Sequence, residues 1–186
     1  MAFTVIYDAN VLFPAPLRDL LIRLAHAGLV RGRWTERILD ECFRNLKVRR
    51  PELSDTGLQR TRLLMNAALR DPLVTGYESL IAGFELPDPD DRHVLAAAVR
   101  SGAQVIVTSN LKDFPASVLK PLGIEAQSPD EFVLNLIDLA PGAVAALVSQ
   151  QAADLKNPPQ TRDQLLETLI SNGLARSVAK LRELFA

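Results

Sequence analysis

The chain contains one cysteine, Cys42, and two histidines among its 186 residues. A lone cysteine cannot form an internal disulfide, and because Cys42 lies on the apolar side of a predicted helix, we expect it in the core. No apolar run is long enough to span a bilayer, and the start MAFTVIYDAN lacks the basic and apolar segments of a secretory signal. These absences predict a cytoplasmic protein with no membrane partner.

An excess of charge of one sign is also absent, since the formal net charge is −1 at pH 7. The charge is nevertheless uneven: residues 1–66 sum to +4 (11 basic, 7 acidic), residues 67–140 to −6 (5 and 11) and residues 141–186 to +1 (5 and 4). An acidic centre beside a basic flank suits a cation-binding pocket with an arm for polyanions. The same asymmetry also fits an ordinary solvated surface.

The sequence motifs of covalent catalysis and of nucleotide phosphate binding are missing. There is no GxSxG nucleophile elbow, no credible Cys–His pair and no Walker glycine loop. What the chain does contain is a set of carboxylates at the starts of helices and the ends of strands. We therefore examine the acids as the candidates for chemistry.

The stretch Leu86–Phe114 carries the densest acidic signal. Asp88 and Pro89 indicate a helix start, and Gly102 ends that helix. At about 100° per residue, Asp91 falls on the apolar stripe of the helix. Helix capping does not explain this position, because a buried carboxylate must be paired, hydrogen-bonded or bound to a metal. Three side chains are predicted on the opposite, solvent-facing side: Arg92, His93 and Arg100.

Two predicted strands end in polar residues. Residues 3–7 (FTVIY) lead into Asp8 and Asn10, and residues 104–109 (QVIVTS) lead into Asn110 and Asp113. Because ligands bind at the carboxyl ends of strands in open α/β sheets, we expect Asn110 and Asp113 beside Asp91. For Asp8, capping of the next turn explains the sequence equally well.

A helix predicted over residues 35–48 supplies a further acid and a basic cluster. Asp40 and Glu41 lie on opposite edges of its apolar stripe, so periodicity does not choose between them. Four basic residues follow within seven positions: Arg44, Lys47, Arg49 and Arg50. They either bind a phosphate backbone or form a solvated face.

Strands and helices alternate up to about residue 140, which predicts an α/β fold with a parallel sheet. Further helices are expected over residues 17–27, 55–69 and 128–139, and short strands over 72–76 and 124–126. After Pro141 the strand signals stop. Residues 1–140 are therefore assigned to an α/β domain, and residues 141–186 to a helical extension, ending in a hairpin, that packs on this domain or on a partner.

Oxygen ligands without histidine or cysteine suit Mg²⁺ or Mn²⁺, and a cation held by carboxylates activates water in phosphodiester hydrolysis. A phosphatase that uses a strand-end aspartate as nucleophile is the alternative, but that chemistry requires a second aspartate where this chain has Asn10.

Four motifs together resemble the PIN domain, the family of metal-dependent ribonucleases that includes VapC-type toxins. They are Asp8-Ala9-Asn10-Val11-Leu12, Glu41 in a Thr-Glu-(x)₄-Glu helix, Asp91 at the start of an Ala-rich helix, and Val107-Thr108-Ser109-Asn110-Leu111-Lys112-Asp113-Phe114. The resemblance covers about residues 1–130. It implies a three-layer α/β/α sandwich with a central parallel sheet of about four or five strands. It also implies that Asp8, Glu41 and Asp91 bind the metal, which favours Glu41 over Asp40.

The chain departs from the family pattern at Asn110, where the fourth acid commonly stands. Asp113 is expected to supply the missing charge as the fourth metal-binding and catalytic acid, with Asn10, Thr108 and Asn110 in support. The sequence thus predicts a Mg²⁺- or Mn²⁺-dependent endoribonuclease of a toxin–antitoxin pair, with RNA as substrate and with an antitoxin and a second copy as candidate partners. An RNA-processing nuclease without an antitoxin and a non-catalytic RNA-binding scaffold are the alternatives.

Overall fold

The computed structural model describes residues 2–186 and contains a four-stranded parallel sheet in the order β2-β1-β3-β4. The strands are β1 (Thr4–Tyr7), β2 (Arg31–Arg33), β3 (Val105–Val107) and β4 (Glu125–Gln127). Ile6 pairs with Arg33 on one side and with Ile106 on the other. Because β1 and β3 are adjacent and parallel, the residues that follow them emerge side by side at one edge of the sheet.

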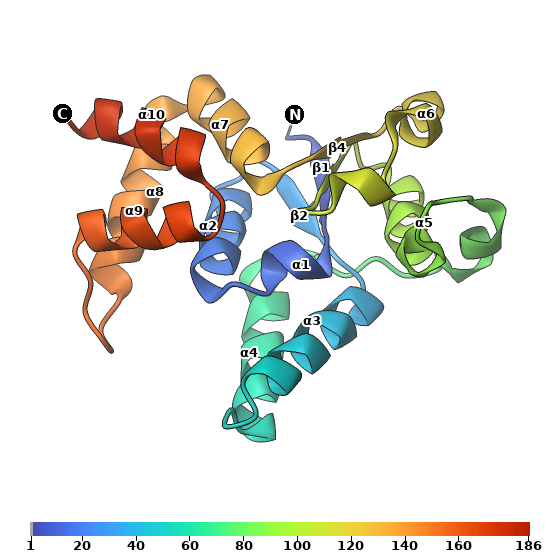
Figure 1. Ribbon diagram of the computed structural model, residues 1–186, viewed down its shortest axis with the longest axis horizontal. Coiled ribbons are helices and arrows are strands. Elements are labelled where there is room, and N and C mark those ends of the chain that lie inside the picture. The colour runs from blue at the N-terminus through green and yellow to red at the C-terminus, as the bar shows by residue number, and fades with distance from the viewer. Residues whose placement is uncertain (1) are drawn as a thin grey trace.

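Helices cover both faces of this sheet, as the sandwich prediction requires (Figure 1). α5 packs against β1 and β3, whereas α2 packs against β2 and α7 against β4. The Tyr7 ring lies on the α7 side, with its centroid 6.1 Å from that of Phe132. The α-helices are α1 (Ala9–Leu12), α2 (Ala15–His26), α3 (Glu36–Arg49), α4 (Asp55–Ala68), α5 (Arg92–Ser101), α6 (Ala116–Leu119), α7 (Pro129–Leu139), α8 (Pro141–Asp154), α9 (Arg162–Ser171) and α10 (Ala175–Phe185).

Four 3₁₀ segments complete the described secondary structure: η1 (Glu78–Gly83), η2 (Pro89–Asp91), η3 (Leu111–Asp113) and η4 (Lys120–Leu122). Two of them carry acids from the predicted set. η2 ends at Asp91 and leads directly into α5, and η3 ends at Asp113 just after β3. Short 3₁₀ turns at these places bring the acids back over the edge of the sheet instead of letting the chain run on.

α3 and α4 form an antiparallel pair that projects from the body of the molecule (Figure 1). Trp34, just before α3, is fully buried and its indole N–H donates to Asn66 Oδ1 on α4 at 2.8 Å. The guanidinium of Arg62 on α4 binds both Glu36 and Asp40 on α3. These contacts fix the direction of α3 and therefore the position of the acids along it.

The last three helices pack on the sandwich. α8 lies against α2, α10 lies against α7, and α9 contacts α2, α8 and α10. The carboxylate of Asp130 on α7 accepts hydrogen bonds from the backbone N–H of Arg176 (3.1 Å) and of Ser177 (2.8 Å) at the start of α10. A charged group thus caps α10 from a neighbouring helix. Among the described helices, none combines the length and the apolar character needed to cross a membrane.

Several sequence predictions are confirmed and two are corrected. Cys42 is buried, and the helix after Ser128 starts where predicted. Residues 72–76 form no strand, because only Leu73 bridges to Trp34. β2 was not predicted at all: Arg31-Gly32-Arg33 lacks the β-branched and apolar residues that mark a strand, and its pairing with β1 decides its conformation.

Candidate active site

Asp8 lies at the carboxyl end of β1 and caps the N-terminus of α1. Its Oδ1 accepts the backbone N–H of Ala9 at 2.7 Å, and its Oδ2 accepts the hydroxyl of Thr108 at 2.8 Å and the side-chain amide of Asn10 at 2.6 Å. The residue is only 4% exposed. Burial raises the pKa of Asp8, and the hydrogen bonds from Thr108 and Ala9 oppose that rise.

Asn10 and Thr108 join the ends of the two central strands. Asn10 Nδ2 donates to Thr108 Oγ1 at 3.1 Å, and Asn10 Oδ1 accepts the backbone N–H of Ser109 at 2.9 Å. The backbone N–H of Asn110 also donates to Thr108 Oγ1, at 3.0 Å. This network holds Asp8 in one orientation, because three separate groups fix the position of its carboxylate and of the hydroxyl that binds it.

Asp91 is half-buried at the end of η2, where the chain turns into α5. Burial, followed in order of effect by the charges of Asp8, Asp88, Asp113 and Glu41, raises its pKa to about 7. Burial alone raises the pKa of a carboxyl group, and neighbouring carboxylates add to the rise by repelling its charged form. Acids from β1, η2, η3 and α3 are thus gathered at one edge of the sheet.

The two residues after β3 differ in their surroundings. Asp113 is buried, being 9% exposed, and its backbone N–H donates to the Asn110 carbonyl at 3.0 Å. Asn110 is exposed, and its side chain makes no hydrogen bond with the described residues. Asp113 is close enough to raise the pKa of Asp91, as expected if it lies beside that residue.

Glu41 and Asp40 point to different partners although they are neighbours on α3. Asp40 binds Arg62 on α4, at 2.5 Å, whereas Glu41 Oε2 lies 3.7 Å from His93 Nε2 on α5. The proximity of the His93 ring is the main cause that lowers the pKa of Glu41. Periodicity left the choice open, and in the structure Glu41 is the one of the two that reaches the acidic edge.

The prediction that His93 faces solvent is wrong, since the side chain is only 2% exposed. α5 is buried on nearly all sides, with η1 packed on the side away from the sheet, so its apolar stripe does not define a single inner face. The available signal was the position of His93 directly before the apolar run Val94-Leu95-Ala96-Ala97-Ala98. His93 is the residue of this site that sequence reasoning missed.

Within residues 2–186, no three side chains of histidine, cysteine, aspartate or glutamate already form a group that could hold a metal ion. The fit to a divalent cation therefore lies in the donor chemistry and the charge. The oxygens gathered here are the donors that Mg²⁺ and Mn²⁺ prefer, and the repulsion around Asp91 is the kind that a cation relieves.

The basic cluster after Glu41 is only partly free. Lys47 pairs with Asp55 at 3.1 Å, Arg50 pairs with Glu52, and the Arg49 guanidinium lies 5.1 Å from the centre of the Phe13 ring. Arg44 is exposed, and its charge contributes to lowering the pKa of Glu41. A cavity of about 430 Å³ lies between α1 and α3. It is lined by Ala9, Asn10, Phe13, Pro14, Asn45, Val48 and Arg49. It opens next to Asp8.

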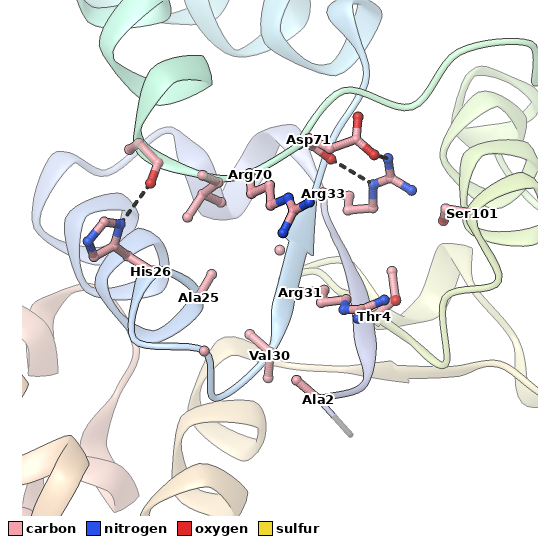
Figure 2. Close-up of a pocket in the computed structure, with 14 residues that line it drawn as sticks. Ala2, Thr4, Ala25, His26, Val30, Arg31, Arg33, Arg70, Asp71 and Ser101 are labelled. Atoms are coloured by element: carbon pink, nitrogen blue, oxygen red, sulfur yellow. Dashed lines mark hydrogen bonds and ion pairs between the residues drawn. The ribbon is translucent and has the colours of Figure 1, made fainter.

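A second cavity, of about 560 Å³, lies at the opposite edge of the sheet, where the strands begin (Figure 2). Arg31, Arg33 and Arg70 line it, and Arg33 Nη2 binds Asp71 at 2.6 Å. His26 Nδ1 lies 2.8 Å from the carbonyl oxygen of Ala68, the last residue of α4. Because α2 and α4 both end here, and a helix C-terminus carries roughly half a negative charge, these cations balance helix ends. None of the predicted site residues lies in this cavity.

Comparison with known proteins gives two family matches. Residues 4–112 match the PIN domain, and residues 129–183 match the VapC50 C-terminal domain. A protein of Mycobacterium tuberculosis (strain ATCC 25618 / H37Rv), named "Putative ribonuclease VapC50", is 44% identical over 110 residues. That region is 59% of this chain and 64% of the relative, so less than two thirds of the relative is spanned. No solved structure matched the chain significantly.

The PIN match covers more than half of the chain and includes β1, α3, η2 and β3, the elements that carry Asp8, Glu41, Asp91 and Thr108. The fold agrees with the match, because a parallel sheet lies between layers of helices. The chain belongs to the PIN domain family.

Proposed function

We propose that this protein is an endoribonuclease that depends on Mg²⁺ or Mn²⁺ and hydrolyses phosphodiester bonds at the acidic edge of the sheet. The observation that carries the proposal is the gathering of carboxylates from four separate elements around Asp91, whose pKa rises to about 7. Membership of the PIN domain family and a relative named as a ribonuclease support the same chemistry.

In this proposal Asp8, Glu41, Asp91 and Asp113 are the catalytic acids and hold the cation. When bound, the cation supplies an activated water and balances the charge that develops on the phosphate. Asn10 and Thr108 hold the Asp8 carboxylate in place, and their hydrogen bonds of 2.6 and 2.8 Å support this role. Asn110, exposed at the end of β3, would contribute an amide oxygen where the family commonly has an acid.

RNA would approach along α3. Arg44 is exposed next to Glu41 and would contact the phosphate nearest the acids, while Arg49 borders the cavity beside Asn10. Lys47 and Arg50 would join the contact by exchanging Asp55 and Glu52 for phosphates, since solvent screens exposed ion pairs of this kind. These contacts follow the backbone and carry no base specificity.

The proposal also gives the protein a role as the toxin of a toxin–antitoxin pair that acts in the cytoplasm. It would consist of a nuclease domain (residues 1–140) and a helical extension (residues 141–186). A cavity of about 630 Å³ between α1 and the α3–α4 pair supports a protein partner, because apolar and basic side chains line it together. Phe43, Leu46 and Leu58 would receive apolar side chains, and Arg49 and Arg50 would pair with acids of the antitoxin. Pairing of two copies is part of the same proposal.

The test is cleavage of a pooled RNA substrate by the purified protein with Mg²⁺, Mn²⁺ or EDTA. We expect cleavage with a metal and none with EDTA, and a loss of at least about a hundredfold in Asp8→Asn, Glu41→Gln and Asp91→Asn. Asp40→Asn is the matched control, because Asp40 neighbours Glu41 but binds Arg62. A folded wild type that cleaves nothing with either metal, or three variants that cleave as the wild type does, would contradict the proposal.

One observation favours a second function, a non-catalytic RNA-binding module. Asn110 stands where the family commonly has an acid, which removes one negative charge from the cation site. Binding of Mn²⁺ and of RNA, together with complete absence of cleavage across RNAs of different sequence, would select this function over the nuclease.

A further inference from the structure

His93 is placed between the acids of the candidate site without being one of them. It follows Asp91 by two residues, its Nε2 lies 3.7 Å from Glu41 Oε2, and its side chain is 2% exposed. His93 is also near enough to Asp8 to affect the pKa of that carboxyl group. One buried imidazole therefore adjoins three of the four proposed metal-binding acids.

The two ring nitrogens of His93 have different surroundings. Nε2 faces the Glu41 carboxylate, whereas Nδ1 is buried and has no hydrogen-bond partner among the described residues. A proton on Nδ1 would be a buried donor without an acceptor, which is costly. A proton on Nε2 instead faces the Glu41 carboxylate, whose Oε2 lies 3.7 Å away, so this contact favours the tautomer protonated at Nε2.

Glu41 needs such a partner more than the other acids do. Asp8 is fixed by Ala9, Asn10 and Thr108, but no described residue donates a hydrogen bond to the Glu41 carboxylate, and the facing His93 Nε2 lies 3.7 Å away. The Glu41 side chain is 36% exposed and long, and it comes from α3, which projects from the body of the molecule. Without a fixed donor its carboxylate would sample several rotamers, and ordering it would oppose ligand binding.

We infer that His93 is a positioning residue: its Nε2 faces the Glu41 carboxylate at 3.7 Å, and a small movement of the Glu41 side chain lets Nε2–H donate a hydrogen bond that holds this carboxylate toward Asp8 and Asp91. The inference rests on the proposed function, since it assigns Glu41 its orientation as a ligand of the proposed cation. Groups that orient metal ligands in this way commonly change metal affinity by about tenfold to a hundredfold when they are removed. His93 itself contributes no bond to the cation.

The contact is tested first without metal, by long-range ¹H–¹⁵N spectra of the imidazole rings. The chain has two histidines, so His26→Leu assigns both ring systems. We expect the His93 signals of the tautomer protonated at Nε2. Glu41→Gln should shift them and leave those of His26 unchanged. A His93 ring protonated at Nδ1, or signals that ignore Glu41→Gln, would overturn the inference.

The consequence is tested by titrating the full-length protein with Mn²⁺ in a calorimeter. His93→Leu should raise the Kd for Mn²⁺ about tenfold to a hundredfold, and His93→Gln should recover most of the affinity because its amide is a donor in the place of Nε2. In a Glu41→Gln background, His93→Leu should have no further effect. His26→Leu, at the opposite edge of the sheet, is the matched control and should bind as the wild type does.

Two failures can be told apart. If the wild type binds no Mn²⁺, or if Asp8→Asn and Asp91→Asn leave its binding unchanged, the proposed metal site is wrong and the role of His93 falls with it. If the wild type binds Mn²⁺ through these acids but folded His93→Leu binds equally well, the inference on His93 alone is wrong. An equal loss of affinity from His93→Leu in the wild-type and Glu41→Gln backgrounds would also overturn it, since that result indicates a general structural effect.

Discussion

At the residue scale, the acidic edge combines a fixed carboxylate with an electrostatically strained one. Asp8 accepts three hydrogen bonds at its two oxygens, whereas Asp91 has a raised pKa and no hydrogen bond to its carboxylate from the described residues. The folded protein therefore holds a group that prefers to stay protonated at pH values where the unfolded chain has already released the proton. This difference links stability to pH.

We predict that Asp91→Asn stabilises the metal-free protein at high pH. The unfolded chain releases this proton near 3.8 and the folded protein near 7, so wild-type stability falls as the pH rises between these values. Because the side chain is half-buried, solvent screens much of the effect, and we expect a gain on the order of 1 kcal/mol at pH 8 and little at pH 4. Urea unfolding in EDTA at both pH values measures it.

The exposed neighbour Asp90 supplies the control for that experiment, because Asp90→Asn changes the same charge without touching the buried position. A gain in Asp91→Asn that is equal at pH 4 and pH 8 would contradict the titration argument.

Thr108→Val tests the network that holds Asp8. The substitution removes the hydroxyl that donates to Asp8 Oδ2 at 2.8 Å and accepts the N–H of Asn110 at 3.0 Å. Since Thr108 is fully buried, we expect a loss of about 1–3 kcal/mol in the free energy of unfolding, together with reduced cleavage. Thr61→Val, at an exposed hydroxyl on α4, should stay within about 0.5 kcal/mol of the wild type, and equal losses in the two variants would refute the argument.

At the element scale, β2 depends on the absence of a side chain at its centre. A Cβ added to Gly32 would lie 2.6 Å from Cε2 of the Tyr7 ring and 3.1 Å from Cβ of Ala25. We predict that Gly32→Ala lowers the free energy of unfolding by about 1–3 kcal/mol, because the buried ring has to move. Gly142→Ala, where a Cβ meets nothing within 4 Å, should be neutral or slightly stabilising in the same denaturant series. An unchanged free energy of unfolding in Gly32→Ala would contradict this prediction, because it would mean that the Tyr7 ring moves at little cost.

Prediction from sequence succeeded for elements whose identity is local. Capping residues such as Ser54 and Ser128 mark helix starts that the structure has within one residue of the predicted place. The fold class followed from the alternation of strands and helices. β2 was beyond reach, because its three residues are extended only through pairing with β1. Such pairing is a long-range property that no short window of sequence contains.

The meeting of Asp8 and Thr108 could be predicted from topology, whereas the burial of His93 depends on packing. Asp8 and Thr108 follow adjacent strands, so their meeting follows from the order of the sheet. The prediction that His93 faces solvent assumed that α5 buries only one stripe of side chains. In the structure η1 packs on α5 as well, so side chains outside the predicted apolar stripe are also buried.

At the scale of the whole molecule, the C-terminal helices are joined to the sandwich by an apolar interface and by one charged cap. Val144, Val148 and Leu165 are fully buried in that part of the chain. Asp130 on α7 accepts the two N–H groups at the start of α10 and also the Ser177 hydroxyl, at 2.7 Å. We therefore expect α8–α10 to unfold together with the rest of the protein.

Asp130→Ala tests this coupling. Removing the carboxylate leaves the start of α10 without its cap and the partly buried Ser177 hydroxyl with fewer partners, so we expect a loss of about 1–3 kcal/mol in a single unfolding transition. The matched control is Asp138→Ala, at an exposed position of the same helix. Two separate transitions in thermal unfolding, with only the first affected by Asp130→Ala, would mean that the extension is an independent unit.

The place of β1 in the sheet has a consequence for the time at which the protein becomes active. The hydroxyl that holds Asp8 belongs to a residue 100 positions further along the chain, and Asp113 comes later still. While the ribosome synthesises the first half of the protein, Thr108 and Asp113 do not yet exist. The site is assembled only after β3 has been synthesised and inserted beside β1. Under the proposed function, a nascent chain built in this order cannot cleave the message from which it is translated until β3 and Asp113 have been synthesised.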